Sequence, residues 1–216
     1  MIDSKHQHDK EATSPVVKTT GKLIHWARVY DLLFARKPTE VHKQLVKEAA
    51  LKPGEHVLDV GCGPGTLALL MATKVAPGGE VVGIDASPQM IERATQKAKK
   101  AAAGARFEVA AIESLPLVDA SFDASTSTFM LHHLPHDVQT KGLAEVRRVL
   151  KPGGQLLIAD FASDSGSFLG HLLSVLGHAH GSSTFPALED ELHKAGFEHV
   201  EQLSSPRKGT MIVRAR

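Results

Sequence analysis

Short apolar runs alternate with longer amphipathic segments along most of this chain. Runs of Val, Leu and Ile bounded by glycine, proline or polar residues are typical of buried strands, whereas apolar residues that recur every three or four positions indicate helices. By these patterns we expect strands at residues 56–60, 80–85, 106–111, 122–129, 155–161, 197–204 and 210–215. We expect helices at residues 22–36, 39–50, 66–75, 88–103, 137–150, 167–176 and 188–196.

The connections between the expected strands determine the topology. Most of them are of helix length, so the strands that they join should lie parallel, with helices on both faces of the sheet. The last two strands are joined by residues 205–209 alone, which is too short for a crossover, so these two strands should pair antiparallel. We therefore predict an α/β, Rossmann-like fold with a seven-stranded sheet, parallel except for an antiparallel last strand.

Composition narrows the classes of function. The 216 residues are 42% hydrophobic and 23% charged, as in ordinary globular proteins, and the net charge of +1 gives no basic field that would attract nucleic acid. The single cysteine excludes an internal disulfide and a Cys-cluster zinc site. No apolar run reaches the length of about 18 residues that a membrane helix needs, and residues 1–20 lack the apolar segment of a secretory signal. We therefore expect a cytoplasmic protein.

The segment LDVGCGPGT, residues 58–66, has the features of a ligand-binding turn. Gly61, Gly63 and Gly65 lie between an expected strand and an expected helix, where glycine permits a positive φ and lets a ligand approach the backbone. In an open α/β sheet this turn lies at the carboxyl ends of the strands, where ligands bind. The alternative interpretation is a tight strand-to-helix turn that binds nothing.

Two carboxylates indicate the kind of ligand. Asp85 ends the next expected strand, where an acid commonly binds two ribose hydroxyls, although it could instead cap the helix that begins at Ser87-Pro88. Asp59 lies inside the first expected strand, where a carboxylate is costly unless a group such as an ammonium pairs with it. Pro64 removes one amide from any phosphate cradle, and Asp59 would repel phosphate. A cationic nucleoside without phosphate, such as S-adenosylmethionine, therefore fits better than a dinucleotide.

Four motifs carry a resemblance to a known family. They are LDVGCGPGT (58–66), VVGIDASPQMIERA (81–94), ESLPLVDASFDASTSTFMLHHL (113–134) and EVRRVLKPGGQLLIADF (145–161). In this order and spacing they resemble the class I S-adenosylmethionine-dependent methyltransferases, and most closely the branch that includes the ubiquinone/menaquinone-biosynthesis enzymes. The resemblance spans residues 22–216. It implies an enzyme that uses S-adenosylmethionine, releases S-adenosylhomocysteine and needs no metal.

The resemblance also implies which residues contact the cofactor. The methionine part would be held by Asp59, Gly61, Gly63 and Gly65, and the ribose by Asp85. The adenine would be flanked by Ala86, Met90, Ile112 and Glu113, the sulfonium by Phe129, and the whole cofactor would be covered by Tyr30. The family usually has an acid at the position of Ala111, so either Glu113 takes over its role or adenine recognition is weaker here.

A histidine pair is the candidate for acid–base chemistry. A methyl group moves by in-line displacement, so a base is needed only where the acceptor must lose a proton. His132 and His133 directly follow the fourth expected strand, and imidazole titrates near neutral pH; we favour His133 as the base. In the alternative interpretation one of the two caps or packs and the other is solvated. Asp160 ends the fifth expected strand at the same rim and would face the acceptor. His178 and His180 have no identifiable third ligand, so we expect no metal site.

Segments outside the four motifs should select the acceptor. Residues 1–20 lack hydrophobic periodicity and should form a mobile tail, followed by a single methyltransferase domain at 21–216. Within it, residues 21–50 should form an N-terminal helical cap, and residues 162–186, which contain many apolar side chains, a lid over the substrate pocket. We therefore expect a small-molecule acceptor of apolar or lipid-like character and no nucleic-acid partner. Whether the chain touches a membrane surface, and whether it is a monomer or a homodimer, both stay open.

The sequence leaves two other functions open and disfavours two more. A bacterial phospholipid head group N-methyltransferase is an alternative within the same family, whereas the altered position Ala111 keeps open a non-catalytic regulatory protein that binds S-adenosylmethionine. A nicotinamide-dependent reductase is disfavoured because the loop lacks the usual spacing of the third glycine and because the chain has no Tyr-x-x-x-Lys pair. Arsenic methylation in this family depends on several cysteines, so the single Cys62 argues against it.

Overall fold

The computed structural model describes residues 39–101, 104–162 and 184–216. Several expectations lie outside these residues: the tail at 1–20, the helices at 22–36 and 167–176, most of the 162–186 lid, Tyr30, His178 and His180.

Seven strands form a single sheet in the order β3-β2-β1-β4-β5-β7-β6. They are β1 (His56–Val60), β2 (Glu80–Asp85), β3 (Ala105–Val109), β4 (Phe122–Thr128), β5 (Leu150–Phe161), β6 (Val200–Leu203) and β7 (Thr210–Ala215). Each pair of neighbours from β3 to β5 is parallel, and β7 is antiparallel to both β5 and β6. The predicted sheet, with a last strand that runs against the others, is confirmed.

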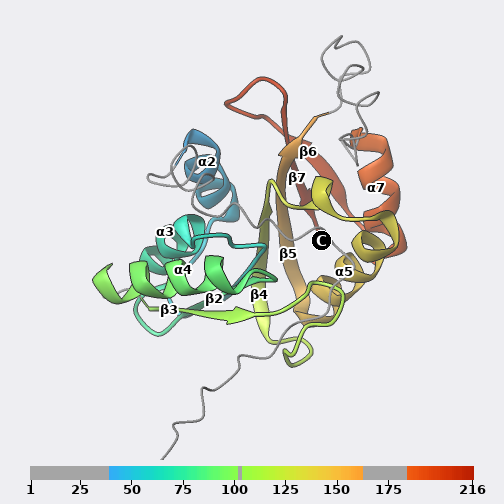
Figure 1. The fold of residues 1–216 in the computed structure, drawn as a ribbon. Coiled ribbons are helices and arrows are strands. Elements are labelled where there is room, and N and C mark those ends of the chain that lie inside the picture. Colours follow the sequence, from blue (N-terminus) through green and yellow to red (C-terminus); the bar gives the residue numbers. More distant parts are fainter. Residues whose placement is uncertain (1–38, 102–103, 163–183) are drawn as a thin grey trace, which may run out of the picture.

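Helices cover both faces of this sheet (Figure 1). They are α2 (Glu40–Ala49), α3 (Thr66–Val75), α4 (Pro88–Ala101), α5 (His136–Val149) and α7 (Phe185–Lys194), with a single 3₁₀ turn η1 (Leu131–His133). Helices α2 and α3 bury Leu45 and Met71 with one set of strand side chains, and α4 lies beside α3. Helices α5 and α7 bury Leu143 and Leu188 against the other face. The sheet therefore has a hydrophobic core on each side.

The first turn of α2 is fixed by side chains of its own. The Thr39 hydroxyl accepts a hydrogen bond from the main-chain N–H of His42 at 3.3 Å, and the Thr39 N–H donates to Nδ1 of His42 at 3.2 Å. This reciprocal capping satisfies two amides that the helix itself leaves without partners. It also fixes the direction of the His42 ring, which matters for the site below.

Several element boundaries differ from those expected; strand β6, for example, begins at Val200 rather than at residue 197, and α7 begins at Phe185 rather than at residue 188. Strand β3 ends at Val109, so residues 110–112 belong to the loop that follows. Strand β5 begins at Leu150 rather than at residue 155, because buried Leu150 pairs with Phe122 and the ladder resumes only at Gln155 after an irregularity in register. The turn-forming residues KPGG therefore lie within the strand as an irregularity rather than between a helix and a strand.

The parallel strands place their carboxyl ends at one edge of the sheet. Gly61 follows β1, Phe129 follows β4, and Phe161 is the last residue of β5. These three positions are far apart in the sequence, yet β1, β4 and β5 are adjacent in the sheet. The fold therefore brings the candidate site residues together at this one edge of the sheet.

Candidate functional site

The glycine loop between β1 and α3 adopts the backbone conformation that its residues allow. Gly65, the residue before α3, has φ +77°, and a Cβ there would lie 2.8 Å from the Phe107 ring and 2.9 Å from Cβ of Ala94. Gly63 has φ +53°, but a Cβ on it would meet no atom within 4 Å. Thus Gly65 is required for packing, whereas Gly63 leaves its side of the loop open for a ligand to approach.

Asp85 ties two loops together at the end of β2. Its Oδ2 accepts a hydrogen bond from the Gly63 N–H at 3.0 Å, and its Oδ1 accepts one from the Ser87 N–H at 2.8 Å. Burial raises the pKa of this carboxyl, and the two amides lower it in part. The helix cap itself is the Ser87 hydroxyl, which accepts the Met90 N–H at 3.4 Å, while Asp85 holds Ser87 in place; each Asp85 oxygen keeps a further lone pair for another donor.

Asp59 lies in the middle of the sheet and is fully buried. Its Oδ1 accepts a hydrogen bond from the hydroxyl of Thr126, its neighbour on β4, at 2.8 Å. Its Oδ2 has no hydrogen-bond partner among the described residues. Burial raises the pKa of Asp59 to about 7, while the Thr126 hydroxyl and the nearby Ala68 amide lower it. The acid thus stays sensitive to any positive charge that binds close to it.

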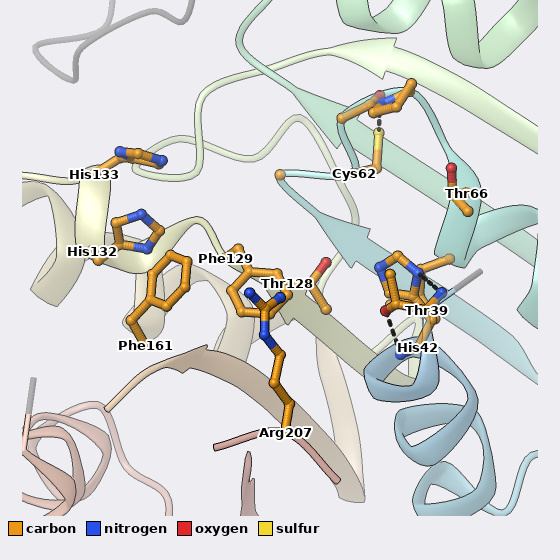
Figure 2. A pocket seen from close by; sticks show the side chains of 14 residues that line it. Thr39, His42, Cys62, Thr66, Thr128, Phe129, His132, His133, Phe161 and Arg207 are labelled. Carbon is orange, nitrogen blue, oxygen red and sulfur yellow. Dashed lines mark hydrogen bonds between the residues drawn. The ribbon is translucent and has the colours of Figure 1, made fainter. Parts of the chain in front are cut away.

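A cavity of about 250 Å³ opens at the carboxyl ends of β1, β4 and β5 (Figure 2). One wall is the glycine loop with the start of α3, and the opposite wall is the end of β4 with the turn after it. Its described lining consists of Thr39, His42, Gly61, Cys62, Gly63, Pro64, Thr66, Leu67, Thr128, Phe129, His132, His133, Phe161 and Arg207. Most of the lining surface is apolar, as in pockets that take small organic molecules.

Two phenylalanines form the floor between the strand ends. The rings of Phe129 and Phe161 lie 5.0 Å apart between centroids, and Phe161 is 41% exposed. Phe129 has φ +50°, a conformation that is costly for a residue with a side chain, and its N–H donates to the Ala159 carbonyl at 2.8 Å. Strained backbone that its surroundings hold in place is common at functional sites.

His132 forms a pair with Asp160 at the cavity wall. Nδ1 of His132 lies 2.6 Å from Oδ1 of Asp160, which is only 5% exposed. The carboxylate also accepts the His132 main-chain N–H at 3.2 Å and the Phe161 N–H at 2.8 Å, so its orientation is fixed. With Nδ1 as the donor to this carboxylate, the tautomer leaves Nε2 with a lone pair that can accept a proton.

His133 belongs to the same 3₁₀ turn but has a different environment. Its ring lies 3.8 Å from the ring of His132. Burial and the neighbouring His132 lower the pKa of His133, and Asp160 raises it in part. The described contacts therefore give His132, rather than the favoured His133, the partner that a general base needs.

The expected cofactor residues fall into two groups. Gly61, Gly63 and Phe129 line the cavity, whereas Asp59, Gly65, Asp85, Ala86, Met90, Ile112 and Glu113 are not among its described lining. Met90 and Ile112 are buried in the protein, as is Ala111. Cys62 borders the cavity, but burial raises the pKa of its thiol well above the usual range. Among the described residues no group of His, Cys, Asp and Glu could hold a metal ion.

Several lining residues were not singled out by the sequence, among them Thr39, His42, Phe161 and Arg207. Thr39 and His42 carry a helix-cap signal, which says nothing about a cavity. Arg207 lies in the short connection between β6 and β7, and only the position of β7 next to β5 brings this turn to the site. No local pattern could have indicated it.

The central part of the chain matches a family model. Residues 57–154 match the family described as "Methyltransferase domain". Within the described residues, no helix has the length and apolar character needed to cross a membrane.

Relatives with assigned names agree with this match. The chain is 39% identical over 120 residues to a ubiquinone/menaquinone biosynthesis C-methyltransferase of a Geobacter species, covering 55% of this chain and 50% of the relative. It is 35% identical over 158 residues to an arsenite methyltransferase of Halobacterium salinarum, covering 71% of this chain and 40% of the relative. The chain thus spans half or less of the length of these two relatives.

Solved structures show the same fold. A SAM-dependent methyltransferase from Aquifex aeolicus superimposes with a TM-score of 0.70 at 24% identity, covering 88% of this chain and 96% of that one. The sheet order, the glycine loop at the end of β1, the acid at the end of β2 and the family match agree with one another. Residues 57–154 therefore match the methyltransferase domain family, and the chain is similar over 55% of its length to a ubiquinone/menaquinone-biosynthesis C-methyltransferase.

Proposed function

We propose that this chain transfers a methyl group from S-adenosylmethionine to a small, largely apolar acceptor whose nucleophilic oxygen or nitrogen must lose a proton. One observation carries the proposal: the His132–Asp160 pair and the glycine loop line the same cavity or lie directly behind its wall. A proton acceptor is thereby placed where a family member would hold its methyl donor. An acceptor that reacts through a carbon of low acidity would have no use for such a pair.

The residues around the glycine loop fit a cationic, phosphate-free cofactor. Asp59 has one buried oxygen without a hydrogen-bond partner among the described residues, and burial raises the pKa of both Asp59 and Asp85. Two such carboxylates disfavour a bound phosphate and favour a positively charged group nearby. When bound, S-adenosylmethionine would supply a methyl group that its positive sulfur has already activated.

We assign the binding roles accordingly. Gly61 and Gly63 would provide the backbone surface, with Phe129 lining the donor region. Asp85 would receive the ribose hydroxyls on its remaining lone pairs while it keeps the Gly63 loop in place. Asp59 is too deeply buried to line the cavity and would act through its charge. Ala86, Met90, Ile112 and Glu113 remain the proposed adenine side, with Met90 and Ile112 contributing as packing.

His132 would take the proton of the acceptor on Nε2. Asp160 holds Nδ1 of the same ring, fixes the tautomer and stabilises the imidazolium once it has formed. Asp160 is thus a positioning residue, oriented in turn by the main-chain N–H groups of His132 and Phe161. His133 packs on the His132 ring, and its lowered pKa keeps it neutral, so that it adds no repulsion when His132 becomes charged.

The cavity wall supports an organic acceptor rather than an inorganic one. Phe129 and Phe161 give it an apolar floor. Although one relative is named an arsenite methyltransferase, this chain has a single cysteine, and burial raises the pKa of that thiol. An arsenic acceptor requires thiolate ligands, which a lone buried thiol does not supply.

Titration with S-adenosylhomocysteine, followed by transfer of labelled methyl from S-adenosylmethionine to a panel of phenols and amines, tests the proposal. We expect binding with a 1:1 stoichiometry and methylation of at least one phenol or amine. His132→Gln should lower kcat by about 100-fold or more, the usual contribution of a general base, with the affinity for S-adenosylhomocysteine unchanged. His199→Gln, an exposed histidine remote from the cavity, is the matched control and should behave as the wild type.

Three results would overturn the proposal or its mechanism. Failure to bind S-adenosylhomocysteine would contradict the proposed role of the glycine loop as the cofactor-binding site. A protein that binds it but methylates nothing in the panel would favour the non-catalytic regulatory protein instead. A His132→Gln variant with wild-type kcat would remove the base from the mechanism, and with it the requirement for an acidic acceptor proton.

A further inference from the structure

Arg207 brings a positive charge to a cavity whose other walls are mainly apolar. It lies in the turn between β6 and β7, and its backbone is held at both ends: its N–H donates to the Ser205 hydroxyl oxygen at 3.3 Å, and its carbonyl accepts from the Ser205 hydroxyl at 3.1 Å and from the Thr210 N–H at 3.2 Å. Figure 2 shows the side chain extending from this turn toward Phe129 and Thr128. The guanidinium therefore faces the cavity from a fixed point of attachment.

The charge of Arg207 is not compensated within the described part of the site. It is the one Arg or Lys in the described lining, which contains neither Asp nor Glu, and it makes no ion pair with any described residue. Burial lowers the pKa of His42 and of His133, so neither adds a positive charge to the lining, and the third histidine, His132, is already paired with Asp160.

The cationic, apolar and imidazole groups of the cavity lie in a row in space. The Phe129 and Phe161 rings lie between the turn that carries Arg207 and the His132 ring, and Phe161 contacts His132 edge-on at 4.9 Å (Figure 2). Phe161 is one of two large hydrophobic residues that are exposed among residues 39–101, 104–162 and 184–216, so an apolar ligand would cover it. Arginine binds carboxylates and phosphates through paired N–H groups, and it stays protonated at any working pH.

Resting on the proposed methyl transfer, we propose that the acceptor is an aromatic or similarly apolar molecule that carries one anionic group, a carboxylate or a phosphate. Its anion binds Arg207, its apolar body packs on Phe129 and Phe161, and the O–H or N–H that is methylated faces His132. Arg207 then determines specificity: it selects an acidic acceptor and sets how far the reacting atom lies from the bound anion. A neutral quinone precursor or a neutral amine would lack the group that this side chain recognises.

The test uses three probes of one shape, titrated calorimetrically into the full chain without any nucleoside: 2-naphthoate, 2-naphthyl phosphate and uncharged 2-naphthalenemethanol. We expect at least one of the two anions to bind the wild type about tenfold more tightly than the alcohol, the size of one charge-assisted contact in a partly hydrated site. The tighter of the two anions identifies the acceptor as a carboxylic acid or as a phosphate ester. Arg207→Gln should bring all three affinities to the same value.

Lys208→Gln is the matched control, because it removes a neighbouring positive charge that does not line the cavity. It should keep the preference for the anion, whereas Arg207→Lys should keep only part of it, since lysine cannot form the paired contact. The inference fails if the alcohol binds as tightly as both anions, if no probe binds, or if the preference survives in Arg207→Gln. These outcomes are separate from those of the methyl-transfer test, because no cofactor takes part in them.

Discussion

The buried carboxyl of Asp59 should make the free energy of unfolding depend strongly on pH. The carboxyl is fully buried, and burial raises its pKa to about 7 in the folded protein. In the unfolded chain its pKa returns to about 3.9. Between these two values the folded protein binds one proton more than the unfolded chain, so the free energy of unfolding must rise as the pH falls from 7 toward 4.

The size of the expected change in the free energy of unfolding follows from the difference between the two pKa values. Each pH unit between them contributes up to about 1.4 kcal/mol, which amounts to roughly 4 kcal/mol over the whole window. Above pH 7 the burial of an ionised carboxylate makes this contribution wholly unfavourable. Asp59→Asn cannot titrate and should lose the dependence, while Asn can still accept the Thr126 hydroxyl on its Oδ1.

Urea unfolding of the wild type and of Asp59→Asn at pH steps from 4.5 to 8.5 measures the effect. The difference in free energy of unfolding between the two proteins should change by roughly 3 kcal/mol between pH 4.5 and 7 and then level off toward pH 8.5, because contributions common to both cancel. How well Asn packs alters only the constant offset, and not the slope. Parallel curves for the two proteins would show that Asp59 ionises normally in the fold, which would refute the reasoning.

A second carboxylate provides a control of opposite sign. Burial raises the pKa of Asp123, but the Lys151 ammonium and the His56 amide outweigh it, so the net shift is downward. A depressed pKa stabilises the folded state above the unfolded pKa, and this stability is lost only as the pH falls below about 4. Asp123→Asn should therefore leave the slope between pH 4.5 and 7 as it is in the wild type.

The remaining predictions concern packing and the loops of the site. Gly65→Ala should lower the free energy of unfolding by about 2–4 kcal/mol in urea titrations, since its Cβ would press on Phe107, whereas Gly63→Ala, with open space around it, should cost about 1 kcal/mol. Asp85→Ala should weaken S-adenosylhomocysteine binding in calorimetry by roughly 1–3 kcal/mol; unchanged affinity would contradict its ribose role. Arg148→Ala should cost about 2 kcal/mol of stability, because this guanidinium donates to the Leu115 and Leu117 carbonyls and binds Glu145; an unaffected urea midpoint would contradict this.

The sequence determined the parts of this protein that depend on local pattern. Alternating apolar runs and helical segments were enough to predict the seven strands and the antiparallel last strand, since a connection of five residues permits nothing else. The glycine loop was equally visible, because positive φ and close packing leave a compositional trace at Gly61 and Gly65. The largest of the boundary errors, at the start of β5, arose because the burial of Leu150 opposite Phe122 overrode the turn-forming residues that follow it.

The tertiary structure alone decided how the chemical groups are combined. Two adjacent histidines have no difference in sequence that marks one of them as the base, and only the pairing of β4 with β5 places Asp160 against His132. Arg207 reaches the cavity because β7 inserts beside β5 and carries its preceding turn to the carboxyl edge. Such contacts join positions separated by 28 residues or more, so they depend on the order of strands in the sheet. A local pattern of residues cannot encode that order; burial of both faces of the sheet does.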